Sequence, residues 1–158
     1  MGLVKLPRMD KAEIDALIGE QILCRIAFGG KNAPYIAPFQ YVFVNRHLYF
    51  HFTDYGRKMG LLDEGQPVCV EIEKYTQDLS AYSFVVLVGK LRIVNDAKER
   101  ATAIEKMVEA AKQKLLSNNF LPAHGIPKED GWVSLAADKP LVIVRLEQVT
   151  EITGLKSP

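Results

Sequence analysis

Four polar residues within eight positions are the strongest candidates for chemistry in this sequence: His51, Thr53, Arg57 and Lys58. Arg57 and Lys58 can neutralise a phosphate dianion, while the Thr53 hydroxyl and the backbone N–H groups of a turn add hydrogen bonds. This combination suits a phosphomonoester. In the alternative interpretation the two cations are solvated charges at a helix start, a position where basic residues are disfavoured by the helix dipole. Both interpretations remain open from the residues alone.

A proline lies inside a second pattern that otherwise predicts a strand, at Pro38 within residues 35–44. Proline has no N–H to donate to a neighbouring strand, so an edge or a bulge is expected there, with backbone groups free for a ligand. Phe39 and Tyr41 can then form an apolar wall. An edge strand without a ligand, with both aromatic residues in the core, is the alternative.

The elements that must position these residues follow from hydrophobic spacing. Capping boxes and 3.6-residue periodicity predict helices over 10–19 and 96–115, and a turn leads into a short helix over 54–63. Strands are predicted over residues 22–28, 35–44, 47–53, 68–73, 82–94 and 141–153, and an irregular excursion over 117–140. Six strands joined mostly as hairpins predict a mainly β fold: a six-stranded antiparallel barrel with added helices, formed by one domain over residues 1–158.

Alternation within the strands predicts which side chains are buried. In residues 47–53 one face is expected to be core and the other polar, and Gly89 is expected to mark a bulge or a barrel corner. In the short helix Met59 and Leu62 should point inward. The core face of residues 47–53 is Leu48, Phe50 and Phe52, and the polar face is Tyr49, His51 and Thr53.

Composition excludes several classes of protein. The chain has 158 residues and 17.7 kDa, with 20 Lys and Arg against 19 Asp and Glu, so it lacks the basic excess that nonspecific nucleic-acid binding needs. Its longest apolar run, residues 84–88, is too short to span a membrane, and we expect a cytoplasmic location. Cys24 and Cys69 are expected to be buried, reduced thiols, and the three histidines have no metal-ligand spacing, so no metal is predicted.

Several segments resemble one known family. The run Leu48 to Lys58, with Leu61-Leu62 and Pro67 to Glu71 after it, resembles the core motif of the FMN-binding split β-barrel family related to pyridoxamine 5′-phosphate oxidase. Within that superfamily the chain is most similar to the Nim nitroimidazole-resistance proteins. Further similarity lies in Arg8-Met9, Cys24 to Phe28, Pro34 to Tyr41 and Ser83 to Leu91, so the resemblance covers roughly residues 8 to 110.

The resemblance implies a homodimer that holds FMN at its subunit interface and acts on a small molecule. It implies that Arg57 and Lys58 grip the FMN phosphate with Thr53, and that His51 contacts substrate or supplies a proton as the catalytic residue. The remaining cofactor-binding residues it implies are Pro38, Phe39, Gln40 and Tyr41 along the flavin ring, Phe52 beside them, and Ser83 near the phosphate or ribityl chain.

The activity implied by the resemblance is that of an FMN-dependent oxidoreductase reducing a small aromatic or nitro-type acceptor. No counterpart of the arginine and histidine residues with which pyridoxamine phosphate oxidases grip their substrate is found, because neither His124 nor Arg145 lies in a matching motif. The alternative is a flavin or haem binding or sensor protein of the same fold that does not turn over. Haem would require one of the three histidines as its axial ligand.

Overall fold

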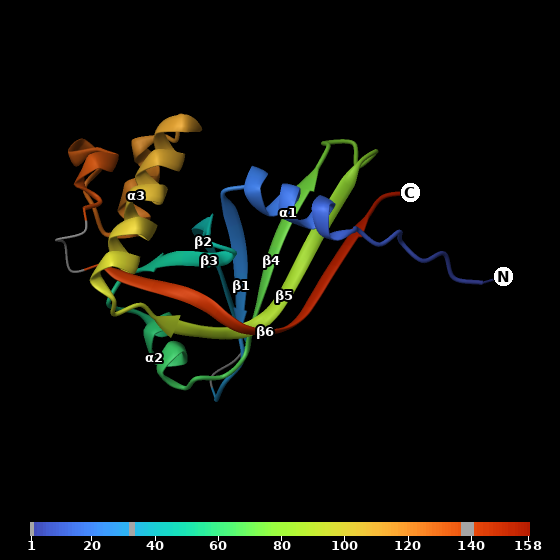
Figure 1. The fold of residues 1–158 in the computed structure, drawn as a ribbon, viewed down its shortest axis with the longest axis horizontal. Coiled ribbons are helices and arrows are strands. Elements are labelled where there is room, and N and C mark those ends of the chain that lie inside the picture. The colour runs from blue at the N-terminus through green and yellow to red at the C-terminus, as the bar shows by residue number, and fades with distance from the viewer. Residues whose placement is uncertain (1, 32–33, 137–140) are drawn as a thin grey trace. The chain divides into compact units, whose positions relative to one another are not determined.

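The computed structural model, which describes residues 2–31, 34–136 and 141–158, confirms the predicted mainly β architecture (Figure 1). Its six strands form a closed antiparallel barrel in the order β1-β2-β3-β6-β5-β4. The strands are β1 Leu23–Phe28, β2 Tyr35–Val44, β3 His47–Phe52, β4 Val68–Tyr75, β5 Tyr82–Ile93 and β6 Val142–Lys156. The α-helices are α1 Lys11–Glu20, α2 Arg57–Asp63 and α3 Ala97–Gln113, and the 3-10 helices are η1 Asn118–His124, η2 Lys128–Asp130 and η3 Trp132–Ser134.

The chain divides into two compact units. The first consists of Met1–Phe39, Gln66–Lys90 and Gln148–Pro158, and the second of Gln40–Gly65 and Leu91–Glu147. The strands β2, β5 and β6 each contribute residues to both units. The single domain expected from the sequence therefore stays a prediction. No helix in the described parts of the chain is long and apolar enough to cross a membrane.

In the first unit, β4 pairs with β1 on one side and with β5 on the other. Alternating side chains of these strands form a core, and Ile26, Val70 and Val85 have no solvent exposure. The helix α1 begins at a reciprocal capping box, as predicted: the Glu13 N–H donates to the Asp10 carboxylate, and the Asp10 N–H donates back to Glu13. Figure 1 shows the segment before α1 passing the end of β6, where Met9 N–H donates to Gly154 O over 2.9 Å.

One sequence expectation in this unit is wrong, and a second is contradicted in part. Cys24 is buried, but Cys69 is exposed, because β4 alternates strictly and places Val68 and Val70 inward. The thiols therefore differ, and burial raises the pKa of Cys24 far above its ordinary value. Gly89 makes no bulge against β4, since the register runs without a break from the Val68–Gly89 pair to the Tyr75–Tyr82 pair. The alternative, a barrel corner at Gly89, stays a prediction.

In the second unit, β2 and β3 form the predicted hairpin. Asn45 and Arg46 turn the chain, with φ angles of 50° and 66°. Two successive left-handed residues form the two-residue turn that matches the twist of paired strands. On its other side β3 pairs with β6, so that His51 lies opposite Ile143.

The helix α3 covers the face of β3 that the sequence predicts to be polar, and that prediction is wrong. Tyr49 packs in one buried cluster with Ile104 and Met107 of α3, and every residue from Leu48 to Thr53 is buried. The Tyr49 hydroxyl donates to the Glu99 carboxylate over 2.7 Å, which satisfies its polar end. The strand β3 is therefore enclosed on both faces, and its polar side chains lie in an interior.

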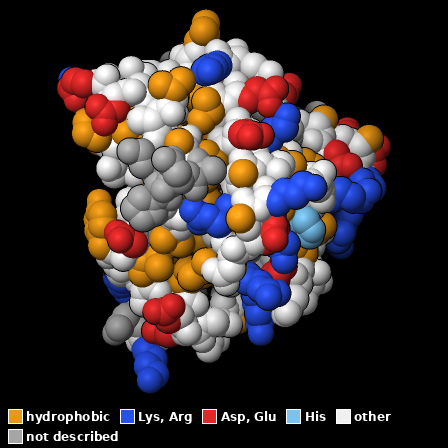
Figure 2. All heavy atoms as spheres, turned by 60° about the vertical axis from the view of Figure 1, so that its left-hand side comes forward, with side chains coloured by type: hydrophobic (Ala, Val, Ile, Leu, Met, Phe, Trp, Pro, Cys, Tyr) orange, Lys and Arg blue, Asp and Glu red, His pale blue; other side chains and the backbone are white. Residues whose placement is uncertain are grey.

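The remaining helical segments differ from their predictions in detail. Asp96 caps α3 as expected, but Glu99 does not complete the capping box, because its carboxylate accepts from Tyr49 and Arg145. In α2 the fully buried residue is Leu61, whereas Met59 and Leu62 are half-buried. The predicted excursion over 117–140 contains the three 3-10 helices, and its residues 137–140 lie outside the described residues. Figure 2 shows acidic and basic side chains interspersed on the described surface, as the balanced composition predicts.

Candidate functional site

The end of β3 and the start of α2 form a corner that carries a lysine with no carboxylate partner among the described residues. The Lys58 ammonium donates to Thr53 Oγ1 over 2.7 Å and lies 5.8 Å from the centre of the Tyr55 ring. No carboxylate of the described residues forms a salt bridge with Lys58. Burial lowers the pKa of this amine. A partly desolvated cation that only neutral groups contact is suited to receive an anion.

The two adjacent cations Arg57 and Lys58 differ in their burial and contacts. Arg57 is exposed, whereas Lys58 is half-buried and held by Thr53. Gly56 precedes both residues with a φ of 94° and makes no side-chain capping bond, so the backbone at the corner is uncovered by a side chain. A Cβ at Gly56 would meet nothing within 4 Å. The corner is therefore open next to the partly buried ammonium.

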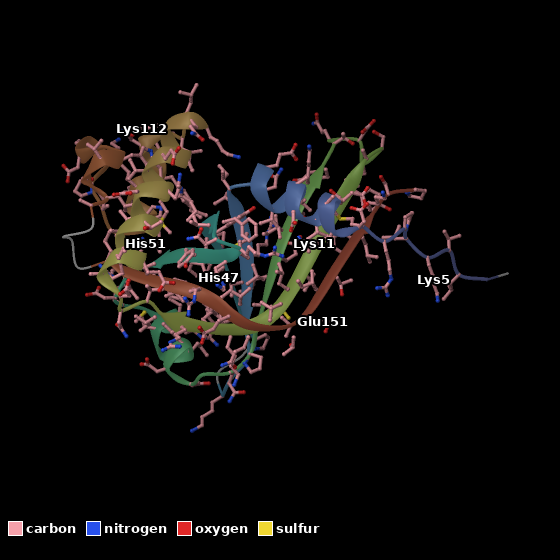
Figure 3. All side chains as sticks on the ribbon, in the orientation of Figure 1. Lys5, Lys11, His47, His51, Lys112 and Glu151 are labelled. Carbon is pink, nitrogen blue, oxygen red and sulfur yellow. The ribbon has the colours of Figure 1, made fainter. Side chains whose placement is uncertain are left out.

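A chain of three buried polar side chains begins two residues before this corner. His51 Nδ1 lies 2.7 Å from His124 Nδ1, and His124 Nε2 lies 2.8 Å from Gln40 Oε1. The two imidazole rings stack with centroids 4.8 Å apart. All three side chains are at most 6% exposed. In Figure 3 His51 lies at the end of β3 beside α3, and His47 lies toward the other end.

Burial keeps His51 and His124 uncharged. It lowers the pKa of His51 to about 3, with further lowering by the nearby charges of His124, Lys58 and Arg100. It lowers the pKa of His124 to about 4. Two imidazoles in contact and out of water cannot both carry a proton without strong repulsion. At neutral pH His51 therefore has no extra proton to supply, which favours a contact role over the predicted proton donor.

Two polar atoms of these three side chains have no hydrogen-bond partner within the described residues: His51 Nε2 and Gln40 Nε2. Buried polar atoms in folded proteins are almost always hydrogen-bonded, so an orphaned atom in a residue that lines a cavity is a candidate partner for a bound molecule. His51 lines such a cavity, and Gln40 does not.

The cavity has a volume of about 300 Å³ and lies between the end of β3 and the 3-10 segments. Its walls combine the polar His51 and Thr53 with apolar groups from the segment after η1. Its lining residues are His51, Phe52, Thr53, Asp54, Tyr55, His124, Gly125, Ile126, Pro127, Asp130, Ser134 and Leu141.

The predicted site residues fall into two groups. His51, Phe52 and Thr53 line the cavity, Lys58 contacts Thr53, and Gln40 joins the site through its side chain. Tyr41 is buried beside them on β2 and does not line the cavity. The others belong to the first compact unit. Pro38 is exposed, and Phe39 is buried against the Phe28 ring. Ser83 on β5 lies opposite Lys74 on β4. Their predicted cofactor contacts stay predictions.

The residue that sequence reasoning missed is His124. It lies at the end of η1 and is buried between His51 and Gln40, with the centre of its ring 5.6 Å from the centre of the Trp132 ring. A 3-10 helix of seven residues has no strong periodicity, so its buried residues leave little pattern in a sequence. The one local signal is Gly125, whose φ of 72° ends η1 directly after the histidine.

We expect Gly125→Ala to destabilise the protein by about 1 kcal/mol, because alanine in the left-handed region is strained. The new Cβ would meet Thr53 Cγ2 at 3.6 Å, an ordinary contact, so backbone strain is the main cost. The matched control is Gly60→Ala in α2, where a Cβ meets nothing and where alanine should stabilise by up to about 1 kcal/mol. Urea unfolding of both variants checks this, and equal midpoints for the two would contradict it.

The fold is a closed six-stranded antiparallel β-barrel, and comparison with known proteins agrees on it. A family model described as pyridoxamine 5′-phosphate oxidase matches residues 10–138. The chain therefore belongs to the pyridoxamine 5′-phosphate oxidase family of that model. No curated protein matches the chain.

Solved structures resemble the chain over nearly its full length. An FAD-binding protein from Mesorhizobium loti is 19% identical with a TM-score of 0.64, covering 98% of this chain and 100% of that one. A candidate 5-nitroimidazole antibiotic resistance protein from Bacteroides thetaiotaomicron is 18% identical with a TM-score of 0.65, over 96% and 87%. An FAD and haem binding protein from Mycobacterium smegmatis is 14% identical with a TM-score of 0.64, over 94% and 71%. At these identities the likeness shows the fold alone.

Proposed function

We propose that this protein binds FMN, with the cofactor phosphate at the corner formed by Thr53, Arg57 and Lys58. The observation that carries the proposal is the half-buried Lys58 ammonium, which has the Thr53 hydroxyl as its hydrogen-bond partner and forms no salt bridge with a described carboxylate. A phosphate dianion would neutralise this charge and restore the interaction energy lost to desolvation. Structural relatives that bind FAD support a flavin as the ligand class.

The residues at the corner fit a phosphate by their chemistry. Lys58 supplies a desolvated cation, Thr53 a hydroxyl that can both donate and accept, and Gly56 a backbone with no side chain over it. Arg57 is exposed on the same turn and can close over a bound phosphate as a second cation.

We further propose that the protein acts as a homodimer with the flavin at the subunit interface. The corner is open next to Gly56, so one chain covers a phosphate bound there on one side only. A second copy would complete the walls. Size-exclusion chromatography with light scattering, with and without FMN, tests this part separately.

The activity we propose is that of an oxidoreductase acting on a small aromatic or nitro-type acceptor. A bound flavin supplies reversible two-electron chemistry that no side chain provides. The chain's own contribution is to hold the phosphate at the corner, to exclude water with the apolar cavity wall, and to offer the uncharged His51 ring to the reacting molecule.

A reconstitution experiment tests the proposed function. Purified protein titrated with FMN should bind one equivalent per chain and show the visible absorption of a protein-bound flavin. Parallel titrations with FAD and haemin separate the other cofactors, because a haem protein shows a Soret band instead. Saturation by haemin alone would overturn the flavin proposal, and the absence of binding by all three ligands would overturn the flavoprotein proposal as a whole.

A further inference from the structure

We infer that the cavity beside His51 binds a neutral ring compound that donates an N–H or O–H hydrogen bond to His51 Nε2. The inference deepens the proposed function, because it assigns the chemical class of the molecule that meets the flavin. It rests on the direction of the hydrogen bonds in the chain Gln40–His124–His51 and on the composition of the cavity wall.

The amide oxygen of Gln40 determines which atoms donate and which accept in the hydrogen bonds from Gln40 through His124 to His51. An amide oxygen only accepts, so His124 Nε2 must carry the hydrogen of the 2.8 Å bond. A neutral imidazole has one N–H, which leaves His124 Nδ1 as an acceptor. His51 Nδ1 must then donate across the 2.7 Å contact. His51 Nε2 is left with a lone pair and no hydrogen.

This lone pair belongs to the atom that has no partner among the described residues. The His51 side chain lines the cavity, so a molecule bound there contacts its ring. A ligand that brings a donor satisfies the atom, whereas a ligand that brings an acceptor leaves two lone pairs facing each other. The unsatisfied lone pair of His51 Nε2 therefore favours ligands that carry an N–H or O–H group.

The rest of the wall indicates that the ligand is uncharged. Asp54 and Asp130 line the cavity and oppose an anion, and Lys58 is not among its lining residues. The apolar groups of the wall also oppose a cation, because a charge buried against them loses its hydration. The volume of about 300 Å³ and the apolar groups Phe52, Ile126 and Leu141 suit one or two fused rings.

Phenol and anisole are matched probes, because they share a ring and only phenol has a hydrogen to donate. We expect phenol to bind the protein about tenfold more tightly than anisole, by NMR titration with and without added FMN. In His51→Phe the preference should vanish, since phenylalanine keeps a ring and removes the lone pair. Equal or tighter binding of anisole to the unmodified protein would overturn the inference.

The ¹⁵N resonances of the histidine rings test the chain directly without any ligand or activity. In protein labelled at histidine, His51 Nε2 should have the shift of an unprotonated nitrogen, and phenol should move it toward the hydrogen-bonded value. Gln40→Met removes the amide that sets the direction, and both histidines should then sample two tautomers. The control Gln113→Met changes an exposed glutamine on α3 and should leave the shifts unchanged. A protonated His51 Nε2 in the unmodified protein would overturn the inference.

The two proposals fail in different ways. If FMN binds but phenol and anisole bind alike, the donor inference is wrong and the flavin proposal stands. If phenol is preferred and no flavin binds, the proposed function is wrong and the donor site exists without it.

Discussion

Acidification from about pH 7.5 to about pH 5 is expected to lower the free energy of unfolding by about 4 kcal/mol, through two buried histidines. The pKa of His51 is lowered to about 3 and that of His124 to about 4, both below the ordinary value of 6.5. Between those values the unfolded chain binds protons that the folded chain does not. Stability is therefore complete above about pH 6.5 and falls as the pH drops, by about 2 kcal/mol per histidine at pH 5.

Urea titrations across this range measure the effect, with the fluorescence of Trp132 as the signal. Trp132 is the chain's single tryptophan, is buried, and lies against His124, so it reports the unfolding of the same region. The double variant His51→Asn/His124→Asn keeps every carboxylate, and the difference between the two pH profiles isolates the histidines. His47→Asn, at the exposed start of β3, is the control and should keep the full slope. An unmodified protein whose midpoint stays constant from pH 7.5 to about pH 5 would contradict the account of buried neutral histidines.

The double variant Arg57→Ala/Lys58→Ala is expected to weaken FMN binding by about 3 to 4 kcal/mol, or two to three orders of magnitude in Kd. Each cation that contacts the phosphate contributes a charge-assisted hydrogen bond, and the two together account for this loss. Lys58→Ala alone should cost more than Arg57→Ala alone, because Lys58 is half-buried and Arg57 is exposed.

Isothermal titration of the flavin-free variants measures these losses. The control Lys112→Ala/Lys128→Ala removes the same charge from two exposed positions and should leave the Kd within about twofold. Circular dichroism should show an intact fold in all variants, since Arg57 is exposed and Lys58 is only half-buried. An FMN affinity in the double variant equal to that of the control pair would remove the corner as the phosphate site.

The sequence predicts the fold well because its signals are local. The box of Asp10 and Glu13 fixes the start of α1, and the break at Asn45-Arg46 fixes the hairpin between β2 and β3. Alternation identifies each strand to within a few residues at either end. Such signals depend on neighbours in the chain, and tertiary packing does not overrule them here.

Burial is predicted less well because it depends on partners distant in the sequence. Alternation in β3 is compatible with one wet face, and only the packing of α3 on Tyr49 shows that both faces are covered. The same limitation affects Cys69, which alternation alone places on the outward face of β4 although its apolar surroundings predict burial. The residue type of Cys69 predicts burial and the alternation of β4 predicts exposure, and the alternation is correct.

About half of the residues of the candidate site could be predicted from the sequence. Its β3 and α2 residues follow one another in the chain, so Thr53 and Lys58 are found together from sequence. His124 lies 73 positions from His51, in a short 3-10 helix, and nothing local indicates that it contacts His51. Gln40 joins the site through its side chain, and nothing local in the sequence indicates that contact with His124.

A comparison of FMN with riboflavin tests the central claim most directly, because the two ligands differ only by the phosphate. The unmodified protein should bind FMN about 100-fold more tightly than riboflavin, and Lys58→Ala should reduce that ratio to about tenfold or less while leaving riboflavin affinity unchanged. Equal affinity of the unmodified protein for both ligands, or the same ratio in Lys58→Ala, would contradict the assignment of the β3–α2 corner as the phosphate site.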